Sequence, residues 1–203
     1  MSKNIKILLV IVLIIFILIF FIQITYKTIK NGNNINKSTN DLIEDILNIS
    51  SYEAKLEVTI NSNKTTNKYE LEQYYMSPNF FKQIVKSPDS IENLEIIYNG
   101  NNLEVRNTNL GLSKIYKNYM YLNENMLWFN CFIDICKKHG YIIEEVDTQI
   151  ILITKIKGKG KLYISKKTSE PTKIEILDNS NQTKIYIEYK EIKINNIQKD
   201  NIL

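Results

Sequence analysis

The most pronounced hydrophobic feature of the chain is an apolar run close to the N-terminus. From Ile7 to Ile22, sixteen residues follow one another without a polar side chain, and lysines lie on both sides. An α-helix that continues to Tyr26 is about 30 Å long, which matches the apolar core of a bilayer. We therefore predict a cytoplasmic stub and a transmembrane helix in residues 1–26.

We expect this helix to be retained as a signal anchor. Cleavage requires small residues after the apolar run, whereas Ile22 is followed by Gln, Ile, Thr, Tyr and Lys. The run also lacks the cysteine of a lipid anchor. Because the N-terminus is short and basic, we place it in the cytoplasm. The expected result is a single-pass protein of the cell membrane with its C-terminal domain outside the cytoplasm.

Beyond the anchor the pattern predicts a spacer and one domain. Residues 27–40 are predicted to be a flexible polar spacer, since the stretch from Lys30 to Asn40 has almost no apolar content. The domain spans residues 41–203 and begins with a short amphipathic helix, for which Asn40 is the N-cap.

In the domain the hydrophobic period changes to two, which is typical of strands with one buried face. Turn signals such as Asn99-Gly100 separate these segments. The predicted strands are Tyr52–Ile60, Lys68–Tyr75, Phe80–Lys86, Leu94–Tyr98, Leu103–Asn107, Tyr141–Val146, Gln149–Ile156, Lys161–Ser165, Thr172–Leu177 and Lys184–Ile194.

Between Tyr116 and Gly140 the strand pattern stops. Apolar residues at helical spacing begin at Leu122, and Gly140 suits the position after a helix end. A helix this apolar must be largely covered. We predict a mainly β (α+β) fold, in which a curved antiparallel half-barrel of about ten strands holds one buried helix in its hollow.

Composition and charge narrow the choice of partners. The chain has 203 residues, which leaves room for one well-packed domain after the anchor. The formal net charge is +4, with basic and acidic residues interleaved. A nucleic-acid binder concentrates its cations on one face, so we expect no nucleic-acid partner.

Catalytic chemistry finds little support in the sequence. His139 is the single histidine, and it is predicted to lie exposed at a helix end rather than in a hydrolytic triad. Cys131 and Cys136 point to different faces of the predicted helix, so with His139 they make a poor zinc site. Lys157–Lys161 lacks P-loop spacing and is predicted to be a solvated hairpin.

The 22 acidic residues leave a glycosidase-type carboxylate pair formally open. Most of them fall on the wet faces of the predicted strands. We therefore predict a protein that is not an enzyme, with no catalytic, metal or cofactor-binding residue.

Six aromatic residues are the candidate contacts for a partner or a lipid. Aromatic side chains are enriched at protein interfaces and in lipid-lined cavities, although they also pack cores. The candidates are Phe80, Phe81, Tyr116, Tyr119, Tyr121 and Trp128.

Several short tracts are similar to the LolA-like superfamily of extracytoplasmic lipoprotein and lipid carriers. Within it the chain most resembles the germination lipoprotein GerS and GerS-related proteins of spore-forming anaerobes. The similarity covers Asp41–Ile194. The tracts are Tyr52 to Gln73 with Asn63-Lys64-Thr65-Thr66-Asn67-Lys68-Tyr69 inside it, Pro78, Ile97-Tyr98-Asn99-Gly100 and Asn125-Met126-Leu127-Trp128-Phe129.

This resemblance implies an incomplete β-barrel with helices at its mouth. It also implies a protein that binds and activates an N-acetylmuramoyl-L-alanine amidase during spore cortex modification and germination. Those relatives carry a lipid-modified cysteine, which is missing here, although an anchor helix would provide the same tethering.

Two functions follow as hypotheses. The first is an amidase partner at the membrane, and the alternative is a LolA-like protein that binds a lipid or lipoprotein at the cell envelope. The hollow distinguishes them. If Leu127, Phe129 and Phe132 fill it, no acyl chain can enter, whereas an open apolar cavity of several hundred Å³ favours a ligand.

Overall fold

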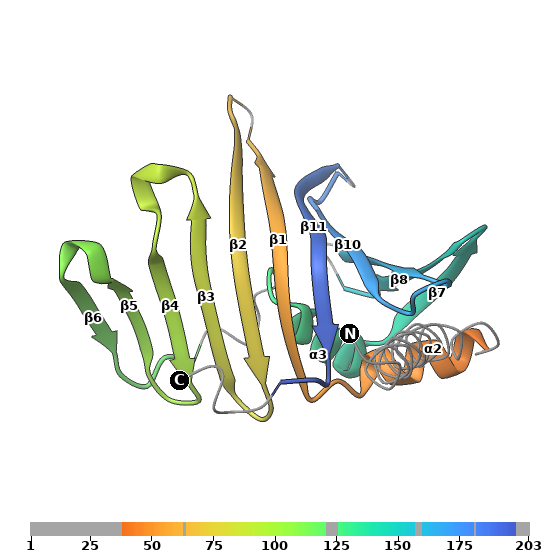
Figure 1. The fold of residues 1–203 in the computed structure, drawn as a ribbon. Helices are drawn as coiled ribbons and strands as arrows, with labels where there is room; N and C mark the ends of the chain where they lie inside the picture. The colour runs from red at the N-terminus through yellow and green to blue at the C-terminus, as the bar shows by residue number, and fades with distance from the viewer. Residues whose placement is uncertain (1–37, 63, 121–125, 157–159, 181, 198–203) are drawn as a thin grey trace, which may run out of the picture. The chain divides into compact units, whose positions relative to one another are not determined.

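The structure is a computed structural model that describes residues 38–62, 64–120, 126–156, 160–180 and 182–197 (Figure 1). The predicted anchor at Ile7–Ile22 and nearly all of the predicted spacer lie outside these residues. Among the helices in the described ranges, none has the length and apolar character needed to cross a membrane.

The described strands form one antiparallel sheet, with the order β6-β5-β4-β3-β2-β1-β11-β10-β9-β8-β7. The first and last strands of the chain, β1 and β11, pair at its centre, and β6 and β7 are its two edges (Figure 1). The strands are β1 Ser51–Asn61, β2 Thr66–Met76, β3 Phe80–Ser87, β4 Leu94–Asn99, β5 Leu103–Asn107, β6 Leu112–Tyr116, β7 Tyr141–Val146, β8 Gln149–Thr154, β9 Gly160–Ser165, β10 Pro171–Leu177 and β11 Thr183–Ile194.

The sheet has eleven strands, whereas the sequence pattern predicts ten, because β6 was not predicted. All five residues of β6 are exposed, so burial imposes no alternation on its sequence. The other ten strands lie where the pattern predicts them, with ends that differ by a few residues. The mainly β, curved and open architecture is confirmed.

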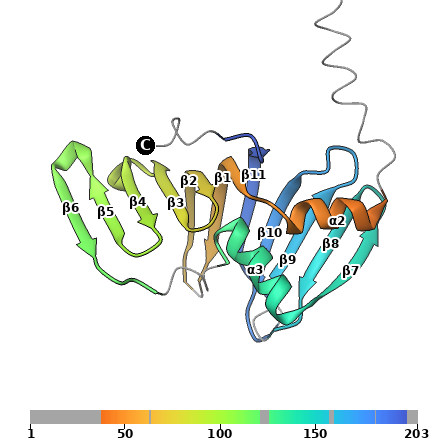
Figure 2. The same cartoon turned by 90° about the horizontal axis from the view of Figure 1, so that it is seen from below.

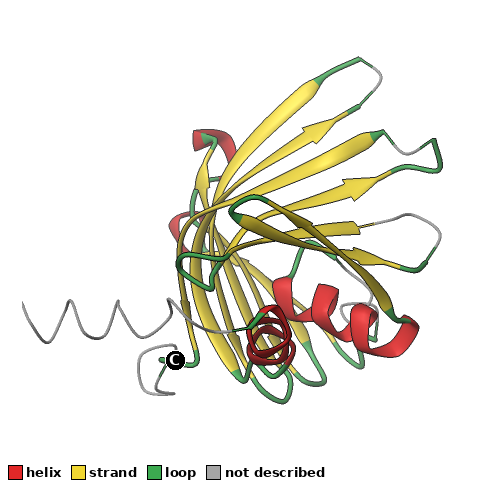
Figure 3. Cartoon of the chain, turned by 90° about the vertical axis from the view of Figure 1, so that its right-hand side faces the viewer, coloured by secondary structure: helices red, strands yellow, loops and turns green. Residues whose placement is uncertain are grey.

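In the described part of the chain, two α-helices, α2 (Thr39–Leu47) and α3 (Phe129–His139), lie on the concave face of the sheet (Figures 2 and 3). Short 3-10 turns, Asp89–Ile91 and Thr108–Leu110, flank the β4 and β5 hairpin. The prediction for α3 was too long at its start. The helix begins after Trp128, whose backbone is extended, and ends at Gly140 with a φ of 81°.

The concave face carries a continuous row of large side chains. Strand register places Tyr52 beside Tyr75, and the row continues through Phe81, Tyr98 and Leu103. Adjacent aromatic rings along it lie 5.3 to 5.7 Å apart. Because side chains alternate between the faces of a strand, this row belongs entirely to the core side.

Helix α3 closes the core over the centre of the sheet. Phe129 and Phe132 are completely buried, and the Phe129 ring contacts Tyr52 edge-on at 5.6 Å between centroids. Gly160 in β9 leaves space for this packing, since a Cβ there would lie 2.6 Å from Cε2 of Phe132. The prediction of a solvated hairpin at Lys157–Lys161 is therefore wrong at Gly160, which is buried.

One buried polar residue ties the helix segment to the sheet. Gln73 in β2 is fully buried. Its Nε2 donates to Oε1 of Gln83 at 3.0 Å and to the carbonyl oxygen of Leu127 at 3.3 Å, and its Oε1 accepts from the hydroxyl of Tyr52 at 3.3 Å. With these partners, burial of the amide carries no large desolvation penalty.

Candidate functional site

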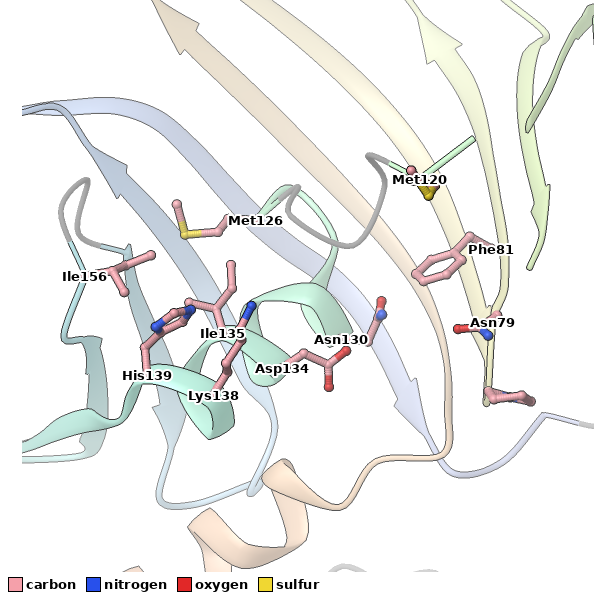
Figure 4. Close-up of a pocket in the computed structure, with 11 residues that line it drawn as sticks. Asn79, Phe81, Met120, Met126, Asn130, Asp134, Ile135, Lys138, His139 and Ile156 are labelled. Atoms are coloured by element: carbon pink, nitrogen blue, oxygen red, sulfur yellow. The ribbon is translucent and has the colours of Figure 1, made fainter. Parts of the chain in front are cut away.

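A cavity of about 620 Å³ lies between α3 and the start of β3 (Figure 4). Its size is within the range of about 300–1,000 Å³ that is usual for small-molecule sites. The lining residues are Pro78, Asn79, Phe81, Met120, Met126, Asn130, Asp134, Ile135, Lys138, His139 and Ile156.

Helix α3 supplies a polar stripe to this cavity. Asn130, Asp134 and Lys138 are spaced by four residues, and such spacing places side chains on one helix face. Asn130 is 4 % exposed, and its Nδ2 donates to Sγ of Cys131 at 3.6 Å. Its Oδ1 is buried and has no partner within the described part of the chain. Burial raises the pKa of Asp134, while nearby Lys137 lowers it.

Apolar side chains line other parts of the cavity. Phe81 is buried, and its ring contacts Trp128 edge-on at 5.3 Å between centroids. Met126 and Ile135 extend this surface along the helix side. The cavity therefore combines an aromatic platform with polar groups from one helix face.

The hollow of the sheet is neither completely filled by side chains nor an open apolar cavity, which were the two alternatives considered from the sequence. Phe129 packs against Tyr52 of β1 and Phe132 against Gly160 of β9, and Leu127 is half-buried. An open volume remains beside the helix, but five of its lining residues are polar or charged: Asn79, Asn130, Asp134, Lys138 and His139.

A second feature lies at the β6 edge of the sheet. Leu112 is 62 % exposed, Ile115 56 % and Tyr116 42 %. A groove of about 450 Å³ is lined by Leu112 and Tyr116 together with Leu94 and Val105, whereas Ile115 projects from the other face of β6. Within the described residues β6 pairs only with β5, so its outer edge is open. We call this set of Leu112, Ile115 and Tyr116 the β6 edge surface.

The structure separates the six aromatic candidates. Phe81 and Trp128 contact each other in the core. Phe80, which precedes Phe81 in the sequence, is half-buried, and Tyr119 packs against the core from a loop. Tyr116 lies exposed at the β6 edge, and Tyr121 lies outside the described residues.

Sequence reasoning missed the polar stripe of α3 and the apolar side chains of β6. The i, i+4 spacing of Asn130 and Asp134 inside an otherwise apolar tract was a readable signal for the stripe. For Leu112 and Ile115 no such signal existed, because their strand has no buried face.

The described residues contain no cluster of side chains suited to binding a metal ion. There, no three His, Cys, Asp or Glu side chains come close enough to hold a metal ion. Cys131 and Cys136 are both buried free thiols, and burial raises the pKa of each to about 12. At neutral pH they are therefore protonated, and poor as ligands or nucleophiles. His139 is exposed at the end of α3, as predicted.

Comparison with known families identifies the group to which the chain belongs. The family of sporulation protein YdcC-like sequences matches residues 5–203. The chain belongs to the YdcC-like sporulation protein family. This family connects the chain with sporulation, as the resemblance to germination proteins implies. No curated protein matches the YdcC-like chain significantly.

Solved structures show where else the fold occurs. An uncharacterised conserved protein from Thermus thermophilus is 12 % identical, with a TM-score of 0.53 over 81 % of this chain and 92 % of that one. This protein shares the fold of the YdcC-like chain.

Two further solved structures superpose less well on the chain. A chain in the complex of the CwlD amidase with the GerS lipoprotein from Clostridioides difficile is 23 % identical, with a TM-score of 0.47 over 77 % of this chain and 95 % of that one. The LolA superfamily protein NE2245 from Nitrosomonas europaea is 11 % identical, with a TM-score of 0.45 over 83 % and 98 %.

Proposed function

We propose that this YdcC-like protein is a membrane-anchored, extracytoplasmic and non-enzymatic partner of a peptidoglycan amidase, which it activates in spore cortex modification and germination. The family supports the connection with sporulation. The GerS-like sequence tracts support the choice of an amidase. The observation that carries the proposal is the β6 edge surface.

An exposed sheet edge is unusual unless something covers it. Unpaired strand edges promote association, and proteins usually protect them with charges, bulges or short length. Strand β6 has only five residues and carries Lys114, yet Leu112, Ile115 and Tyr116 are exposed on it. Leu112 and Tyr116 lie on one face of β6 and line the same groove, and exposed apolar side chains that gather in this way mark interaction sites. The edge can add a strand from a partner, while the groove beside it accepts apolar side chains.

The proposed anchor is the apolar run Ile7–Ile22, which would hold the domain against the outer face of the cytoplasmic membrane. Protease added to intact protoplasts tests this arrangement. The domain should be digested while the N-terminal stub stays protected. Recovery of the full chain from the soluble cytoplasmic fraction would contradict it.

Co-purification tests the partner. Full-length tagged protein, isolated from sporulating cells, should carry a wall amidase with it. The double variant Leu112→Ser/Ile115→Ser should lose the amidase, because it removes one exposed apolar side chain from each face of the edge strand. A matched control is Ile142→Ser/Val146→Ser, which changes two side chains of similar exposure, 50 % and 51 %, on the opposite edge strand β7.

The control should retain the amidase. The proposal fails if repeated purifications recover no wall hydrolase, or if the β7 variant loses the amidase as completely as the β6 variant does.

The cavity beside α3 supports a second candidate function, a LolA-like protein that binds a lipid or lipoprotein. Its volume of about 620 Å³ is sufficient for an acyl chain, and Phe81 and Met126 offer apolar contacts. Native mass spectrometry of the purified full-length protein would show a bound lipid as a defined mass increment. A spectrum of the unliganded chain alone would count against this function.

A further inference from the structure

The cavity beside α3 has hydrogen-bond acceptors along one side. Asn130 is 4 % exposed, and its buried Oδ1 is without a partner among the described residues. Asp134 follows one helical turn later, and both side chains point from α3 toward Asn79 and Phe81 (Figure 4). A buried carbonyl oxygen without a donor is unfavourable, so a ligand that donates to Asn130 gains binding free energy there.

Cationic and donor groups lie at the other end of the same helix face. Lys138 lies one turn beyond Asp134, and His139 lies toward Ile156 (Figure 4). The Asp134 carboxylate and the Lys138 ammonium balance in formal charge. Between the two ends, Phe81, Met126 and Ile135 provide apolar surface.

This arrangement discriminates between classes of ligand. An acyl chain would cover Asn130 and Asp134 without giving either a hydrogen bond, which is costly. A simple organic cation would pair with Asp134 but would also meet Lys138. A peptide offers an N–H donor at nearly every residue, apolar side chains, and one carboxylate at its C-terminus.

We propose that this cavity binds a short peptide, with backbone N–H groups donating to Asn130 and Asp134 and a free C-terminal carboxylate held by Lys138. The inference goes beyond the proposed amidase contact and does not depend on it, and it competes with the lipid-binding candidate for the same cavity. The cavity lies between α3 and β3, whereas the amidase contact is placed on β6.

Trp128 provides a direct readout of occupancy. It is the only tryptophan of the chain, and its ring lies 5.3 Å from that of Phe81, which lines the cavity. Binding that moves Phe81 should therefore change the intrinsic fluorescence. The titration uses the full-length chain in a tryptophan-free amphipol, with trialanine, trialanine amide and decanoate as probes.

Trialanine should produce a saturable change in the fluorescence of Trp128. Trialanine amide should bind about tenfold more weakly, because it has lost the charge-assisted bond to Lys138. The substitution Lys138→Ala should weaken the binding of trialanine by a similar factor, and it should remove the preference for a ligand with a free carboxylate. The matched control is Lys137→Ala, since Lys137 is the neighbouring exposed lysine and lies outside the cavity lining.

Asn130→Leu should also weaken the binding of trialanine about tenfold, because the amide oxygen that accepts its N–H group is lost. Asp134→Asn tests the same wall at an exposed position where folding is not at risk. Weaker binding in Asp134→Asn and unchanged binding in Lys137→Ala support the proposal. No saturable response to trialanine, a response to decanoate alone, or equal effects of Lys137→Ala and Lys138→Ala would overturn it.

Discussion

The two ends of the sheet have the same architecture but very different surroundings. In β8 and β9 the inward residues, such as Ile150 and Leu162, are completely buried, because α2 and α3 cover this end (Figure 2). In β4 and β5 the inward residues Tyr98 and Leu103 are buried too, but Ile96 and Val105 remain partly exposed, and Leu112 of β6 is 62 % exposed. Burial here depends on the helices rather than on the strands. The covered end therefore acts as a scaffold, and the uncovered end is available for binding.

The largest effect should come from the helix that separates these two environments. Phe132→Ala removes a fully buried ring and should lower the free energy of unfolding by about 3–5 kcal/mol. Tyr116→Ala at the uncovered edge should change it by less than about 0.5 kcal/mol. Urea denaturation of both variants measures the contrast. Equal losses of stability would contradict the division into a scaffold and a free end.

An intermediate effect is expected where the polar network joins the turn before α3 to the strands. Gln73→Leu leaves the carbonyl oxygen of Leu127 and the hydroxyl of Tyr52 without their bonds to Gln73. We expect a loss of about 1–3 kcal/mol in the free energy of unfolding. Gln83→Leu is the control, because this residue is only half-buried and should cost less. A neutral Gln73→Leu would show that the network is not needed for stability.

A smaller effect on stability is expected at the proposed docking surface. Leu112→Ser/Ile115→Ser should stay within about 0.5 kcal/mol of the wild-type free energy of unfolding, since both side chains are already exposed. Thermal unfolding followed by circular dichroism checks this. Loss of the amidase together with a large loss of stability would mean that the variant disrupts the fold rather than the contact.

The smallest effect concerns the β7 edge and its dependence on pH. Glu145 of β7 accepts a bond from Nζ of Lys166 at 2.8 Å, and this bond, with a second to Thr39 of α2, lowers the pKa of Glu145. A lowered pKa in the folded state stabilises the protein above the unfolded pKa of about 4.3, and the contribution disappears as the pH falls through the folded value.

Glu145→Gln should therefore flatten the acid side of the stability profile and leave the rest unchanged. Melting temperatures between pH 7 and pH 3 measure this. Glu144→Gln, the exposed neighbour on the other face of β7, is the control. Identical acid profiles for wild type and Glu145→Gln would contradict the assignment.

The sequence predicts the fold where burial imposes a pattern and fails where it does not. The alternation from Tyr52 to Ile60 reflects one buried face, and ten strands could be placed in this way. Strand β6 has no such constraint. The early start predicted for α3 has a different cause, since Met126 and Leu127 lie in a turn and Trp128, whose backbone is extended, packs into the core before the helix begins.

The candidate site was predictable only in part. Phe81 and Trp128 could be chosen as aromatic, but their contact depends on strand register and on the position of α3, which a one-dimensional pattern does not contain. The cavity itself arises because α3 covers one end of the curved sheet and leaves space beside β3.

Hydrogen–deuterium exchange of the full-length protein, with and without a purified spore-cortex amidase, tests the central claim most directly. If the uncovered end of the sheet is the binding surface, the amide protons of β5 and β6 should exchange more slowly in the complex, while those of β7 keep their free rates. Protection confined to β7, or no protection anywhere at saturating amidase, would contradict the account.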